Sequence, residues 1–128
     1  MYKIINTIQA PLPIGPYSQG IVSNNMIITA GQIPINPQTG MISNDIKEQT
    51  IQVLNNIKAI ITAAKFTIKD IVKTNLFLKN LDNLKIVNVV YANFFLQYVT
   101  TYPARTCLEI SNLPNNVEIE IEAIAIKQ

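Results

Sequence analysis

Two segments of helical periodicity, separated by a segment with the pattern of a strand, constrain the fold of this chain most. In residues 45–64, apolar side chains recur three and four positions apart, which predicts a helix with one buried face. Asp45 is a residue type that commonly caps such a helix, and Glu48, three positions later, completes the pattern of a capping box.

The second helical segment covers residues 84–98, and Asp82 stands where a cap is expected. The apolar face of this helix contains Phe and Tyr residues, which we interpret as residues of the core rather than as a surface that binds a ligand. Between the two helices, residues 71–78 predict a strand with Val72 and Thr74 on the same side.

Five further strands are predicted in residues 3–8, 20–22, 26–29, 104–110 and 117–126. The order of elements is then β-β-β-α-β-α-β-β, an α+β fold in which a mixed sheet carries both helices on one face. The other face would be apolar and bare in a single chain, and an exposed apolar face of that size requires a partner. We therefore expect an oligomer.

Carboxylates alternate with apolar residues in the last predicted strand. Glu118, Glu120 and Glu122 therefore share one face, with successive side chains about 7 Å apart. Strict alternation places Ile124 and Ile126 on that same face, which requires either burial of this end of the face or a bulge that shifts the register.

Length and composition predict one globular domain, residues 1–128, with 48% hydrophobic residues. A net charge of +2 gives no basic surface for nucleic acid, and the absence of His excludes His-based catalysis and His metal ligands. One Cys cannot form an internal disulfide, and no targeting segment or apolar stretch of membrane-spanning length is present. We expect a cytoplasmic protein that binds neither membrane nor metal.

Arg105 is the only arginine beside nine lysines. In a chain biased toward lysine, the remaining arginine is a candidate for a task that lysine cannot perform, above all planar, bidentate binding of a carboxylate. The alternative is a surface arginine left by chance.

The residues around Arg105 leave two more alternatives open. Arg105 could be the cation that balances the three carboxylates, although their spacing alone favours a solvated strand face whose charges discourage aggregation. Cys107, on the same predicted strand face as Arg105, would need an activating cation to act as a nucleophile, and packing is the more usual role of such a cysteine.

Several motifs together resemble one known family across essentially the whole chain. They are residues 14–20 (IGPYSQG), 31–34 (GQIP), 70–74 (DIVKT), 87–88 (VN), 103–106 (PART) and 119–125 (IEIEAIA). Each motif alone is weak, but the ordered set is similar to the RidA (YjgF/YER057c/UK114) family.

The resemblance implies a chorismate-mutase-like fold that assembles as a barrel-like homotrimer with three pockets between neighbouring subunits. It also implies a hydrolytic deaminase that works without a cofactor. Its substrates would be reactive enamines and imines such as 2-aminoacrylate and 2-aminocrotonate, and its products 2-keto acids and ammonia.

Site residues follow from the resemblance position by position. Arg105 matches the arginine that holds the substrate carboxylate, and Glu120 the acidic residue that positions the attacking water. Tyr17 matches the aromatic residue that closes the pocket. Gly31 and Cys107 would offer backbone groups to the ligand. Asn88 matches a position near the pocket.

Two residues depart from the family pattern. Ala30 stands where many members have Ser, which removes a hydroxyl contact. Lys65 stands where a helix-ending Gly is common, and a non-glycine residue in a left-handed conformation costs about 1 kcal/mol.

Three other functions remain as alternatives. A trimeric sensor that binds small 2-keto acids without turnover would need Arg105 but not Glu120. RNA cleavage, sometimes ascribed to the wider family, fits poorly with the balanced charge. A chorismate mutase follows from fold analogy alone, and its dianionic substrate would require more than one arginine.

Overall fold

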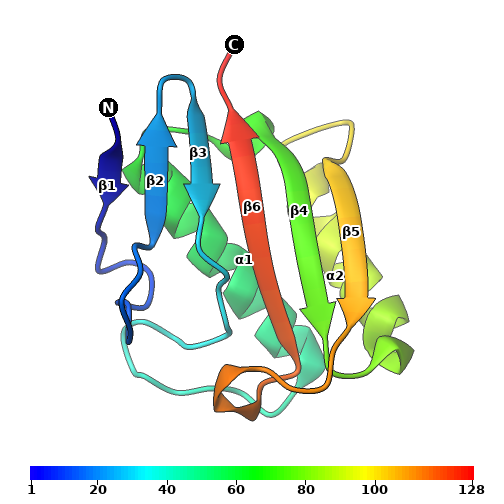
Figure 1. Ribbon diagram of the computed structural model, residues 1–128. Coiled ribbons are helices and arrows are strands. Elements are labelled where there is room, and N and C mark those ends of the chain that lie inside the picture. The colour runs from blue at the N-terminus through cyan, green and yellow to red at the C-terminus, as the bar shows by residue number, and fades with distance from the viewer.

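The computed structural model describes residues 1–128 and has six strands and two helices in the predicted order. The helices are α1 (Ile46–Ala63) and α2 (Leu84–Leu96). The strands are β1 (Lys3–Ile5), β2 (Gly20–Ser23), β3 (Met26–Thr29), β4 (Ile71–Leu78), β5 (Ala104–Glu109) and β6 (Ile119–Ile126). They form one sheet in the order β1-β2-β3-β6-β4-β5, in which only β4 and β5 are parallel (Figure 1).

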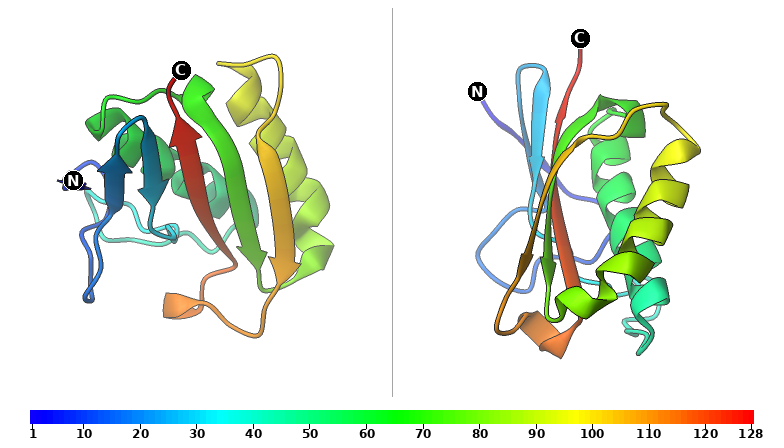
Figure 2. Two further views of the ribbon diagram at one scale, coloured as in Figure 1. Left: turned by 45° about the horizontal axis from the view of Figure 1, so that its top comes forward. Right: turned by 90° about the vertical axis from the view of Figure 1, so that its right-hand side faces the viewer.

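Both helices pack on the same face of the sheet, so the predicted α+β architecture is confirmed. The right-hand view of Figure 2 shows the sheet edge-on, with α1 and α2 on one side and no helix on the other. The core lies between the helices and the sheet, where side chains such as Leu54, Phe95, Leu76 and Ile121 are fully buried. Neither helix is both long and apolar enough to cross a membrane.

The uncovered face of the sheet, which we call the open face, is apolar at one end. Ile4, Ile21, Ile28 and Ile126 all point to it from adjacent strands and are between 36% and 49% exposed. Burying such surface releases about 25 cal/mol for each Å² removed from water, which favours association. The prediction of a bare apolar face is therefore confirmed for this end of the open face, whereas the other end carries Glu120 and Glu122.

The register of β6 explains why Ile124 and Ile126 share a face with the glutamates. Strand β6 alternates without a bulge, and Ile124 pairs with Ile28 on the open face. The bulge lies instead in β4, where the register shifts between Ile71 and Lys73. The expectation that Val72 and Thr74 share a side is therefore wrong: Thr74 is buried under the helices, whereas Val72 is 42% exposed.

The helix caps agree with the sequence only in part. The Asp45 side chain accepts a hydrogen bond from the Glu48 N–H, as predicted. In a capping box the Glu48 carboxylate would accept a hydrogen bond from the Asp45 N–H. Here it accepts from the Ser43 hydroxyl, and Ser43 Oγ in turn accepts from the Asp45 N–H, so Ser43 links the two residues.

At the second helix, Asp82 does not act as the cap. A 3₁₀ turn, Leu81–Asn83, precedes α2, and the side chain of Asn80 accepts from the Asp82 N–H. Asn80 therefore caps the 3₁₀ turn, and the N-cap residue of α2, Asn83, makes no side-chain capping hydrogen bond.

The first strand is shorter than predicted and ends at Ile5. Beyond it the chain leaves the sheet, and the Thr7 N–H donates to Oε1 of the buried Gln19 at 2.7 Å rather than to a neighbouring strand. The following loop bows away from the helices, on the side of the open face (Figure 2).

Helix α1 ends in a Schellman motif with Lys65 in the left-handed position. The Lys65 N–H donates to the Thr62 carbonyl and the Phe66 N–H to the Ile61 carbonyl, both at 2.9 Å. Lys65 has φ +65° and an exposed side chain, as expected for a residue in the place of a C-terminal glycine.

We expect Lys65→Gly to raise the free energy of unfolding by roughly 0.5–1 kcal/mol, because glycine adopts this conformation without steric cost. Chemical denaturation of both proteins measures the change. Lys65→Ala is the matched control: it removes the charge but keeps the Cβ, so it should bring no such gain. An equal gain from alanine would show that charge, not backbone conformation, is responsible.

Candidate functional site

Arg105 lies on β5, at the edge of the sheet, and projects to the face that carries the helices. Its register partner on the parallel neighbour β4 is Thr74, which is buried under α2. The guanidinium carbon stands 5.0 Å from the ring centroid of Tyr91, a residue of α2. Asn88 and Arg105 line the same hollow of about 370 Å³, between α2 and the start of β5.

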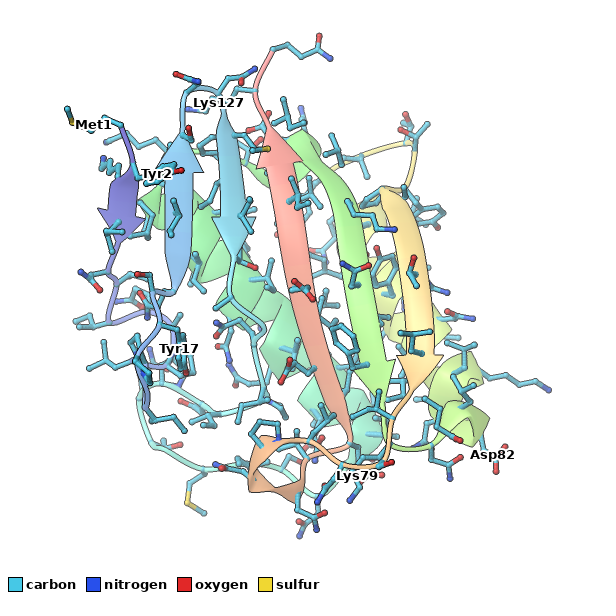
Figure 3. The ribbon with its side chains drawn as sticks, in the orientation of Figure 1. Met1, Tyr2, Tyr17, Lys79, Asp82 and Lys127 are labelled. Atoms are coloured by element: carbon cyan, nitrogen blue, oxygen red, sulfur yellow. The ribbon has the colours of Figure 1, made fainter.

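Glu120 lies on β6 and projects to the open face. Its register partner is Phe77, whose neighbours Leu76 and Leu78 are buried on the opposite side. A hollow of about 290 Å³ surrounds its carboxylate. It is lined by Ile14, Tyr17, Ala30, Gly31, Ile33, Pro114 and Glu120. Tyr17 projects from the loop between β1 and β2, on the opposite side of the molecule from β5 (Figure 3).

The six predicted site residues therefore form two separate groups in one chain. Tyr17, Gly31 and Glu120 meet at the open face, whereas Asn88 and Arg105 meet at the helix side of the sheet edge. Cys107 joins the second group, because it follows Arg105 by two positions and packs against the core.

Within one chain, Arg105 cannot be the cation that balances the glutamates. Strand β4 separates β5 from β6, and Arg105 and Glu120 point to opposite faces of the sheet. The structure holds one ion pair, between Lys79 and Glu118 at 3.6 Å, so Arg105 has no carboxylate partner.

Glu120 has an unusual electrostatic environment. Burial raises the pKa of its carboxyl, and the negative charge of Glu122 on the same strand face raises it further. A carboxyl with a raised pKa is a better proton acceptor when ionised and a usable proton donor when protonated, as general acid–base chemistry near neutral pH requires.

Cys107 is not prepared for nucleophilic attack. Burial raises the pKa of its thiol, and the charge of Arg105 opposes that rise only partly. The thiol stays protonated at neutral pH, which agrees with a packing role.

Gly31 makes room for the Glu120 carboxyl. A methyl group at position 31 would lie 2.9 Å from Glu120 Cδ and would collide with Oε2. Ala30, next to it, presents only a methyl group to the hollow, so the hydroxyl contact that the resemblance suggests is missing here.

Buried amide side chains hold the loops that form the Glu120 hollow. Gln19 donates from Nε2 to the carbonyls of Thr7 and Pro11, both at 2.9 Å, and so fixes the loop that carries Tyr17. Asn56 of α1 donates to the carbonyls of Ile33 and Ile35 at 3.1 and 3.0 Å.

A third buried amide, Gln49, ties the chain before α1 to the start of β6. It donates to the Ser43 carbonyl at 2.8 Å and accepts from the Glu118 N–H at 2.9 Å. No local sequence pattern predicts the roles of these amides, because their partners lie 6 to 69 positions away. The one available signal was that the three amide residues stand within or beside segments predicted to be helix or strand.

No group of three or more carboxylate or thiol side chains lies together as a set of metal ligands.

Removing the charge of Glu122 should lower the pKa of Glu120. Glu122→Gln eliminates the like charge that favours protonation, so the Glu120 carboxyl should titrate at lower pH than in the wild type. Carbon-13 NMR of the side-chain carboxyls measures this titration. Glu118→Gln is the matched control. Because the charge of Glu118 is paired with Lys79, its removal should leave the pKa of Glu120 nearly unchanged. An unchanged titration in Glu122→Gln would contradict the assigned cause.

Gly31→Ala should displace the Glu120 carboxyl while leaving the fold intact, because the new methyl group takes its place. Crystal structures of the variant and of the control Gly15→Ala test this. At Gly15 the added methyl group meets only the Tyr17 ring at an ordinary 3.5 Å. Glu120 in an unchanged position in Gly31→Ala would refute the steric argument.

Comparisons with known proteins match the chain to one family over almost its whole length. The sequence pattern of the family described as endoribonuclease L-PSP matches residues 7–127. The chain is 50% identical to the 2-iminobutanoate/2-iminopropanoate deaminase of Escherichia coli K12 over 128 residues, the full length of both proteins. It is equally similar, over the same length, to a RutC family protein of Buchnera aphidicola from Schizaphis graminum.

Solved structures give the same result for the fold. The crystal structure of the Escherichia coli YjgF gene product superposes with a TM-score of 0.96 at 49% identity, covering 98% of this chain and 99% of the other. Escherichia coli TdcF, determined with bound serine, superposes with a TM-score of 0.96 at 44% identity and the same coverage. With a family match over almost its whole length and relatives at half identity, this chain belongs to the RidA/YjgF family, the group described as endoribonuclease L-PSP.

Proposed function

We propose that this protein is a cofactor-independent 2-iminobutanoate/2-iminopropanoate deaminase, formed by a single RidA-like domain. It hydrolyses reactive enamines and imines such as 2-aminoacrylate and 2-aminocrotonate to pyruvate or 2-ketobutyrate and ammonia. The observation that carries the proposal is Arg105: the only arginine is exposed at a hollow and has no carboxylate partner in its own subunit. Relatives at 50% identity bear the name of this activity.

The active site, in this proposal, is completed by a second copy of the chain. Arg105 and Glu120 point to opposite faces of one sheet, so a small imino acid cannot touch both in one subunit. A homotrimer in which the open faces line an inner barrel would bury the exposed isoleucines. It would also bring the Arg105 hollow of one subunit against the Glu120 hollow of the next.

The chemistry then needs little more than positioning. Arg105 holds the substrate carboxylate through two parallel N–H···O bonds. The substrate reacts as its imine, protonated on nitrogen by solvent: Glu120 accepts a proton from a water molecule, the water oxygen adds to the imine carbon, and the C=N electron pair moves to nitrogen. Glu120 then returns its proton to the nitrogen of the carbinolamine. The C–N bond breaks as the C=O bond forms, the hydroxyl proton passes to Glu120, and the released ammonia takes that proton away as ammonium.

The remaining residues shape the pocket. Tyr17 closes it from the loop that Gln19 fixes, and Gly31 and Cys107 offer backbone groups to the ligand. Asn88 borders the Arg105 side. The free thiol of Cys107 fits a reducing compartment, and we place the reaction in the cytoplasm.

A coupled assay tests the activity directly. Threonine dehydratase generates 2-aminocrotonate, and semicarbazide traps the imine that is not hydrolysed. The wild type should suppress trapping, while Arg105→Ala and Glu120→Gln should each lower kcat/KM on the order of 100-fold. Glu118→Gln, a neighbouring carboxylate outside both hollows, should behave as the wild type.

Two outcomes would redirect the proposal. If the wild type binds 2-ketobutyrate without suppressing trapping, the protein is a sensor of 2-keto acids. If Glu120→Gln retains full activity, the water is positioned by another group.

Mixing subunits tests whether the site is shared. In a ring, each pocket takes Arg105 from one subunit and Glu120 from its neighbour. Random assembly of equal amounts of Arg105→Ala and Glu120→Gln subunits then leaves about a quarter of the pockets with both wild-type residues. The mixture should regain about that share of wild-type activity. Continued inactivity, with mixed trimers verified by native mass spectrometry, would contradict a shared site.

A further inference from the structure

The guanidinium of Arg105 rests on the face of Tyr91, a residue to which the chemistry above gives no role. The guanidinium carbon lies 5.0 Å from the ring centroid, within the range of a cation–π interaction. Arg105 is exposed, whereas Tyr91 is only 4% exposed. An exposed side chain therefore lies against a buried ring.

Two contacts fix the Tyr91 ring. Its hydroxyl and Thr74 Oγ1 share a hydrogen bond at 2.7 Å, and its ring packs against Phe95 with the centroids 4.6 Å apart. Thr74 is also the register partner of Arg105 across β4 and β5. The strand pair that sets the backbone of Arg105 therefore also sets the ring beneath its side chain.

The phenol of Tyr91 remains neutral under these conditions. Burial raises its pKa, and the hydrogen bond with Thr74 and the charge of Arg105 only moderate that rise. A neutral ring supports the guanidinium without neutralising it, which leaves its full charge for a ligand.

The guanidinium lies over the Tyr91 ring and makes no side-chain hydrogen bond within the subunit, so its N–H groups are free. The subunit contains no carboxylate that occupies them. A free arginine loses considerable rotamer entropy when it grips a ligand, and a side chain already held in plane loses less.

We propose that Tyr91 is a positioning residue, whose ring fixes the plane in which Arg105 presents its N–H groups to the substrate carboxylate. This inference rests on the proposed function, because it assumes that Arg105 binds that carboxylate. It predicts an effect on carboxylate affinity rather than on the chemical step.

Tyr91→Leu removes the ring and keeps an apolar core residue. Its dissociation constant for 2-ketobutyrate, measured by NMR titration, and its KM in the coupled assay should both rise about fivefold, with kcat changed less than twofold. Tyr91→Phe keeps the ring and should restore most of the affinity. Circular dichroism and sedimentation verify that both variants fold and assemble as the wild type does.

The Arg105→Lys background separates positioning from general structural damage. Lysine has no planar group to stack, so adding Tyr91→Leu to Arg105→Lys should change the dissociation constant less than twofold. A similar fivefold loss in both backgrounds would show a merely structural role and overturn the inference.

The remaining outcomes distinguish this inference from the proposed function. If the wild type binds 2-ketobutyrate and Tyr91→Leu binds it equally well, the role of Tyr91 is wrong and the proposed function stands. If the wild type neither binds 2-ketobutyrate nor hydrolyses the imine, both are wrong.

Discussion

Side-chain alternation along two strands of one sheet is the constraint on which the account of this protein depends. Glu120 pairs with Phe77 and faces away from the helices, while Arg105 pairs with Thr74 and faces toward them. A shift of one residue in either register would exchange the faces. Arg105 and Glu120 are therefore kept apart within a chain, and the proposed chemistry requires association between chains to bring them together.

This separation leaves each half of the site in an unfavourable state in the single subunit. Glu120 is half-buried beside a like charge, and Arg105 has no counter-charge. Both conditions favour a ligand with a carboxylate at one end and a polar reacting group at the other.

The exposed isoleucines of the open face provide the apolar surface that would hold the proposed trimer together. The buried amides Gln19, Gln49 and Asn56 provide rigidity where the loops have no sheet to support them.

Periodicity predicted the elements and the faces well, because both depend on neighbouring residues. The Asp45 cap and the face on which Glu120 lies follow from local patterns, whereas the left-handed Lys65 was expected from the family resemblance. The suggestion that Arg105 balances the glutamates was wrong, because periodicity does not reveal strand order and β4 inserts between β5 and β6. The amides that fix the loops, and the ring under Arg105, depend on contacts between distant segments, which no local pattern encodes.

A crystal structure of the protein with 2-ketobutyrate would test whether the site is shared between subunits. We expect a ring of three chains with the ligand between neighbours. Its carboxylate should be gripped by both edge nitrogens of Arg105 from one chain, and its keto carbon should lie within one water molecule of Glu120 from the next. A ligand held wholly within one chain, or one that contacts Arg105 but lies far from every Glu120, would contradict the shared site.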